Sequence, residues 1–225
     1  MRICAVTQAY QEPLLEQWHR HYKAQGVCEL MVTHDILPEL DDMKKTGTML
    51  AIMKTNADRF DYFICADADE LLVPIRYATL KEMAEKEPKD FYCSKGFNMV
   101  AVPSDLPYDP DQYLTDQRKH GFEWEPESKV VMYKSGYEPS VNVAFHPNIH
   151  SRQWDSMGIP DVLLLHYVAF DHDISLARRK RNGNRVGPIN TARGHGVGNV
   201  GHDDEWWEEW LRSHWSNPNI VQVIP

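Results

Sequence analysis

Residues 61–66 (DYFICA) form a short, almost wholly apolar stretch within the first third of the chain. Such a stretch predicts a strand, and its lack of polar alternation indicates burial on both faces. Strands of this kind occur in parallel sheets that are covered by helices, and their crossover connections are nearly always right-handed. The stretch therefore predicts an α/β fold.

Two more predicted strands come before this one, and a helix follows each of them. The first is Arg2–Thr7 (RICAVT), and a helix with one apolar face runs from Leu14 to near Gln25. The second is Glu29–Thr33 (ELMVT), and the apolar residues between 49 and 53 predict the next helix. Together with the strand at 61–66, these elements make the first third of the chain a strand-helix-strand array.

The rest of the chain is more mixed. Thr79 and Glu82 match a capping box at the start of a helix. Strand-like stretches separated by Pro- and Gly-bearing loops then predict antiparallel pairing, and helical patterns follow them. The predicted strands are 91–103, 128–133, 141–145 and 161–170, and the predicted helices are 174–181 and 204–215. A length of 225 residues fits a single domain over 1–225, with a mixed sheet flanked by helices.

Composition excludes several classes of protein. Hydrophobic residues make up 42% and charged residues 25% of the chain, as in folded globular proteins. The sequence has no apolar stretch of the roughly 18 residues needed to span a membrane, and its first residues, MRICAVTQAY, lack the basic region followed by a long apolar stretch that is typical of a signal peptide. Its four cysteines form no CxxC pair. We therefore expect a cytoplasmic protein without a transmembrane segment. The net charge of -9 argues against general binding to a nucleic-acid backbone.

Asp67 and Asp69 directly follow the strand at 61–66. Ligand sites in open α/β sheets lie beyond the carboxyl ends of the strands, which is where this acidic pair falls. Two carboxylates one residue apart point the same way in an extended chain, so they can share Mg²⁺ or Mn²⁺ and neutralise a leaving diphosphate. The alternative is that these acids cap a helix beginning near Glu70.

The chain also resembles glycosyltransferases of GT-A type, similar to the family 2-like and family 92-like group. The resemblance rests on RICAVTQAYQEPLLEQWHRHYKAQGV, MVTHD, DYFICADADELLVP and LLLHYVAFDHDISLARRKRNG, although Gln11 and Glu12 stand where the family has an Asn-Glu-like turn. It implies a Rossmann-like GT-A fold, with residues 1–75 as the nucleotide-binding half and 76–225 as the acceptor half. It further implies a nucleotide-sugar donor linked to UDP, a Mn²⁺ or Mg²⁺ cofactor and an inverting transfer to a glycan or other hydroxyl acceptor.

Several donor-side roles follow from the resemblance. Asp67 would contact the ribose or the metal, Asp69 would be the main metal ligand, and His166 would be its distant third ligand, the alternative for His166 being a core histidine. Asp35 would accept a hydrogen bond from the nucleobase, or it is a turn residue. Further donor contacts are expected from Thr7, Tyr10, Arg178 and Arg181, the last two lying in a basic stretch that is otherwise a solvated helix face.

The acceptor side is less defined by the sequence. An inverting transferase needs a base near the acceptor hydroxyl, and Glu123 and Asp155 are the candidates to test first, ahead of Glu125, His146 and His150. The Trp-rich helix at 204–215 packs onto the domain or forms an acceptor platform.

Two other functions stay open on the sequence alone. One is a nucleotidyltransferase of related fold, and the other is a nucleotide- or carbohydrate-binding module without turnover.

Overall fold

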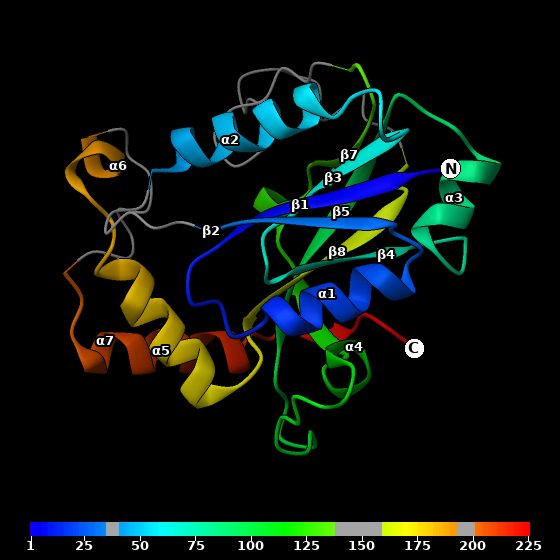
Figure 1. The fold of residues 1–225 in the computed structure, drawn as a ribbon. Coiled ribbons are helices and arrows are strands. Elements are labelled where there is room, and N and C mark those ends of the chain that lie inside the picture. Colours follow the sequence, from blue (N-terminus) through cyan, green and yellow to red (C-terminus); the bar gives the residue numbers. More distant parts are fainter. Residues whose placement is uncertain (35–40, 138–158, 193–200) are drawn as a thin grey trace.

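A computed structural model describes residues 1–34, 41–137, 159–192 and 201–225. In these ranges the chain forms a nine-stranded mixed sheet flanked by helices, so the predicted α/β class is confirmed (Figure 1). None of the described helices is long and apolar enough to cross a membrane. The elements in chain order are β1 (Ile3–Ala9), α1 (Leu15–Ala24), β2 (Glu29–His34), α2 (Asp42–Thr55), β3 (Tyr62–Cys65), β4 (Glu70–Pro74), α3 (Leu80–Lys86), β5 (Phe91–Val100), α4 (Leu114–Gln117), β6 (His120–Glu123), a 3-10 turn (Glu125–Glu127), β7 (Val130–Lys134), β8 (Val162–Ala169), α5 (His172–Gly183), α6 (Pro188–Ala192), α7 (Asp204–Trp215) and β9 (Val221–Gln222).

The sheet combines a parallel and an antiparallel part. Strand β1 lies between β2 and β3 and is parallel to both. Strand β7 joins β3 to β5 by antiparallel pairing, and β5 then pairs with both β6 and β8. Strand β8 is parallel to β5 and antiparallel to β4. The parallel start and the mixed second half both agree with the prediction.

Both faces of β1 are buried, each under a different helix. Ile3 and Ala5 belong to the main core with Trp18 and Tyr22 of α1. The alternate residues, Cys4 and Val6, pack instead with Met49 and Met53 of α2. In Figure 1, α2 and α1 accordingly lie on opposite sides of the β2-β1-β3 strands. The alternation follows from the two-residue period of a strand, and it explains the continuous apolar sequence of β1.

Some local expectations were wrong or incomplete. The alternative that Asp67 and Asp69 cap a helix near Glu70 is wrong, because Glu70–Pro74 is strand β4 and pairs with β8. Strands β4, β6 and β9 were not predicted. The capping box does form, since the Thr79 hydroxyl accepts from the Glu82 amide at 3.1 Å. The predicted strand at 141–145 lies outside the described residues.

Candidate functional site

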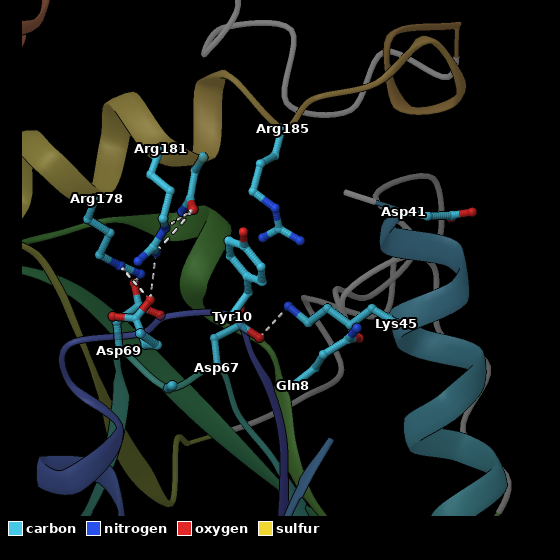
Figure 2. Close-up of a pocket in the computed structure, with 12 residues that line it drawn as sticks. Gln8, Tyr10, Asp41, Lys45, Asp67, Asp69, Arg178, Arg181 and Arg185 are labelled. Atoms are coloured by element: carbon cyan, nitrogen blue, oxygen red, sulfur yellow. Dashed lines mark hydrogen bonds and ion pairs between the residues drawn. The ribbon is translucent and has the colours of Figure 1, made fainter. Parts of the chain in front are cut away.

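A pocket lies at the carboxyl ends of β1 and β3, between α5 and α2 (Figure 2). It encloses about 110 Å³ and is lined by both acidic and basic side chains. Tyr10 and Glu12 come from the loop after β1, while Asp67 and Asp69 come from the loop after β3. Because β1 and β3 are parallel neighbours, their following loops meet at one edge of the sheet.

A tight turn from Asp67 to Glu70 holds the acidic pair. The Glu70 amide donates to the Asp67 carbonyl at 2.9 Å, and the Asp67 amide donates to the Glu70 carboxylate at 2.9 Å. That carboxylate is itself buried and pairs with Lys129 at 2.6 Å, both side chains being 3% exposed. The Glu70–Lys129 ion pair therefore holds the turn in place from the interior of the domain. This ion pair was not predicted from the sequence, in which Glu70 is the acidic residue that follows Asp69.

Asp69 is buried and surrounded by positive charge. Its Oδ2 accepts a hydrogen bond from the Arg178 guanidinium and lies 2.9 Å from His166 Nε2. The other ring nitrogen of His166, Nδ1, is 3.0 Å from Asn98 Oδ1. Burial alone would raise the pKa of Asp69, but the charges and hydrogen bonds of Arg178 and His166 outweigh it and hold the pKa well below its usual range. Asp69 is thus an ionised carboxylate.

Arg178 links this carboxylate to the loop after β1. Its Nε donates to Glu12 Oε2 at 3.0 Å, so one guanidinium bridges two buried acids. Arg181 donates to the same Glu12 oxygen at 3.2 Å and also to the Gln11 carbonyl. Gln11 has a positive φ of 47°, a conformation that most side chains disfavour. Two arginines of α5 therefore clamp the β1 loop in a strained shape.

The opposite side of the pocket is formed by α2 and by the chain beyond α5. Lys45 of α2 pairs with Asp67 Oδ1 at 2.5 Å (Figure 2). The Arg185 guanidinium lies over the Tyr10 ring, with its carbon 3.8 Å from the ring centre. Gln8 also lines the pocket, and its buried Oε1 has no hydrogen-bond partner among the described residues. The pocket therefore presents four basic side chains and an unsatisfied amide oxygen.

The predicted metal ligands do not gather around a common point. Asp67 faces Lys45, whereas Asp69 Oδ2 is engaged by both Arg178 and His166. Both ring nitrogens of His166 lie within hydrogen-bond distance of protein oxygen atoms, one on Asp69 and one on Asn98, so protein groups already occupy both sides of the ring. Within the described part of the chain, no three acidic, histidine or cysteine side chains are arranged to hold a metal ion. In this arrangement the residues do not fit a metal.

Comparison with known proteins gives little further information. No protein-family model matches the chain, and no curated protein matches it in sequence. Among solved structures, A197 from STIV is similar with a TM-score of 0.38 and 10% identity, over 74% of this chain and 82% of A197. At this identity and TM-score, the similarity indicates neither an activity nor a site residue.

The structure brings five of the predicted donor-side residues into the pocket: Tyr10, Asp67, Asp69, Arg178 and Arg181. His166 contacts Asp69 from behind and does not line the pocket. Thr7 is fully buried, and the neighbouring Gln8 lines the pocket instead. Asp35 lies outside the described residues.

Of the two catalytic bases predicted first, Glu123 is not brought to the pocket, and Asp155 is not among the described residues. Glu123 pairs with Lys95 at 2.9 Å and sits opposite Phe97 in the β5–β6 register. Neighbouring positions of a strand point to opposite faces, so Glu123 lies on the other face of the sheet from Asn98 and His166. Asp155, His146 and His150 lie outside the described residues. Lys45 and Glu12, in contrast, line the pocket but were not predicted as site residues, although Glu12 stands at the Asn-Glu-like turn of the resembling family.

Proposed function

We propose that the chain is a glycosyltransferase that takes a sugar from a nucleoside-diphosphate sugar, with UDP as the nucleotide, and passes it to a hydroxyl acceptor. The observation that carries this proposal is the meeting of two distant segments in one pocket. The Asp67–Asp69 turn follows a central parallel strand, and the α5 arginines that face it lie more than 100 residues later in the chain. Both segments belong to the stretches that resemble GT-A enzymes.

The donor diphosphate is assigned to the four basic side chains of the pocket. Lys45, Arg178, Arg181 and Arg185 surround the cavity, and guanidinium groups suit bidentate contacts to phosphate oxygens. As the bond between sugar and diphosphate breaks, negative charge grows on the leaving phosphate. Fixed cations placed around that phosphate stabilise the transition state more than the ground state. We call this cavity the donor pocket.

The acidic residues of the donor pocket have a positioning role in this proposal. Asp69 and Glu12 hold Arg178 between them, and His166 holds Asp69 from the other side. Asp67 holds Lys45 at the edge of the cavity until the donor arrives. Gln8 and Tyr10 supply an amide oxygen and an aromatic face for the nucleobase.

Mn²⁺ or Mg²⁺ as a cofactor stays a prediction from the sequence. A metal at Asp67 would need Lys45 to move away, and no step of the present proposal passes through a metal.

Release of a nucleoside diphosphate tests the proposal. The protein would be incubated with a panel of nucleotide sugars, with and without Mn²⁺, and free UDP or GDP would be measured by a coupled assay. We expect release from a UDP-sugar, and a loss of at least a hundredfold in the Asp69→Asn variant. The matched control is Asp90→Asn, which removes an exposed carboxylate paired with Lys134.

Binding without release would favour the alternative of a nucleotide-binding module, which the ion pairs of Asp67 and Asp69 also suit. No binding and no release for any nucleotide sugar would contradict both functions.

A further inference from the structure

Aromatic side chains line one face of α7. Trp206, Trp210 and His214 are spaced four residues apart, and this spacing places them on the same side of a helix. The row extends backwards through His202, whose ring stacks on Trp206 with the centroids 3.5 Å apart. The ring centroids of Trp210 and His214 lie 4.0 Å apart. By the rise of a helix, the row from Trp206 to His214 spans about 12 Å.

The row continues from α7 onto the sheet. His214 contacts Phe122 of β6, with the ring centroids 5.7 Å apart, and Phe122 contacts Trp124 at 6.4 Å. Trp124 has an extended backbone and its amide donates to the Gly96 carbonyl, so it lies on the same face as Phe122. We call the six residues His202, Trp206, Trp210, His214, Phe122 and Trp124 the aromatic track.

The strand register connects the aromatic track to the donor pocket. Phe122 pairs with Asn98 of β5, and Asn98 pairs with His166 of β8. Directly paired side chains point to one face of a sheet, as the hydrogen bond between Asn98 and His166 also requires. His166 in turn contacts Asp69. The track therefore begins two strands away from Asp69 and leads outward along α7, which packs against α5 (Figure 1).

The aromatic track is accessible at Trp124 and Trp206, whereas Phe122 is buried. Trp124 is 46% exposed and Trp206 is 38% exposed, which is unusual for such large rings. Charges of both signs surround the track. In the N-terminal part of α7, Asp204 pairs with Lys180, Glu208 with His172 and Glu209 with Arg212. The Arg179 guanidinium lies over the Trp210 ring, with its carbon 4.5 Å from the ring centre. Partly exposed aromatic rings suit the apolar face of a sugar ring. The chain's net charge of -9 favours an uncharged ligand over one that carries phosphates or sulfates.

We propose that the aromatic track is the acceptor subsite and that its ligand is a neutral oligosaccharide. This inference rests on the proposed function, because a sugar ring bound near Phe122 and Trp124 would be next to the place where the donor sugar leaves its diphosphate. The apolar face of a pyranose ring packs on an aromatic ring, and the length of the track accommodates more than one sugar unit. The chain's net charge of -9 disfavours a nucleic acid or an anionic membrane as the ligand.

Calorimetric titration with defined oligosaccharides tests the subsite. The neutral probes are cellohexaose, maltohexaose, mannohexaose and chitohexaose, and the anionic comparison is a heparin hexasaccharide. We expect at least one neutral probe to bind and the heparin probe to bind more weakly. Trp206→Ala and Trp124→Ala should each weaken the neutral probe at least fivefold, while Trp206→Tyr, which keeps an aromatic ring, should retain most of the affinity.

Two controls separate this inference from the proposed function. Phe91→Ala removes an aromatic ring that is also 38% exposed but lies on β5 away from the track, and it should leave oligosaccharide affinity unchanged. UDP binding, measured on the same samples, should be unchanged in all four variants.

The subsite is overturned if no neutral probe binds while UDP does, if heparin binds more tightly, or if the two alanine variants bind like the wild type. Absence of UDP binding alone would contradict the proposed function and leave the aromatic track as a carbohydrate-binding surface.

Discussion

The donor pocket and the aromatic track are built in opposite ways. The donor pocket consists of buried charges from segments far apart in the chain, such as Glu12 and Arg178, which are 166 residues apart. The aromatic track consists of six rings, three of them four residues apart on one helix, and all except Phe122 are at least partly exposed. A buried charge that loses its partner is strongly destabilising, whereas an exposed ring can be removed at little cost. The donor pocket should therefore couple binding to folding, and the aromatic track should not.

Replacing Arg178 by Met should have the largest effect. The change leaves Asp69 and Glu12 buried without their common cation, and we expect the free energy of unfolding to fall by about 3–5 kcal/mol. Urea denaturation followed by circular dichroism measures this free energy of unfolding. Arg59→Met is the matched control, because Arg59 is half-exposed and pairs with Glu29 at the surface, where a loss of less than about 1 kcal/mol is expected. Equal losses in the two variants would contradict a special role for the buried cluster.

Replacing Arg181 by Met should affect binding more than folding. Arg181 shares Glu12 with Arg178 but is more exposed, so its loss leaves the main ion pair in place. A hydrogen bond to a charged group contributes about 1.5–3 kcal/mol, which corresponds to a loss of roughly tenfold to a hundredfold in UDP affinity. Calorimetry measures the affinity for UDP. Arg59→Met is the control, because Arg59 pairs with Glu29 outside the pocket. An unchanged affinity for UDP would remove Arg181 from the donor pocket.

Removal of divalent metal should have a smaller effect on UDP binding. Lys45 and the three arginines already supply positive charge in the pocket, so we expect EDTA to change the dissociation constant for UDP by less than about tenfold. The measurement is a calorimetric titration in EDTA and in Mn²⁺, with UMP as a control that carries one phosphate fewer. Binding that occurs only with Mn²⁺ would restore the metal site predicted from Asp67 and Asp69.

Two histidines near α7 should respond to pH in opposite directions. Burial lowers the pKa of His214, so its contribution to stability is full at neutral pH and is lost as the pH falls below the usual histidine value. Hydrogen bonds to Asp173 and Glu208 raise the pKa of His172, so its contribution is full at acidic pH and is lost as the pH rises. Urea denaturation between pH 5 and 8 measures how far the free energy of unfolding falls toward acidic pH. Compared with the wild type, this fall should be smaller in His214→Gln and larger in His172→Gln. Identical slopes would contradict this account of the two sites.

The sequence predicts the features that depend on local patterns. The helix Asp204–Trp215 was predicted with the bounds that the structure has, because its Asp203 cap and Trp spacing are local. Strands β1, β2 and β3 were predicted because each is a short apolar run followed by a polar loop. Their parallel pairing followed from burial on both faces.

Other features depend on contacts that one sequence does not reveal. Lys45 belongs to a polar stretch without a motif, and only the packing of α2 beside β1 brings it to Asp67. Glu12 is linked to Arg178 through the fold alone. Strand β4 was missed because Glu70 directly after Asp67 and Asp69 looks like the first turn of a helix. The proximity of Phe122 to His166 depends on the β5 register, which the sequence does not fix.

A crystal structure with a bound UDP-sugar tests the central claim most directly. Our account predicts the diphosphate between Lys45 of α2 and the arginines of α5, with its oxygens at hydrogen-bond distances of about 3 Å from at least two of the four basic side chains. It also predicts the sugar on the side of the pocket that leads to Phe122 and Trp124. A nucleotide bound elsewhere, or a diphosphate held without any of these four side chains, would contradict the account.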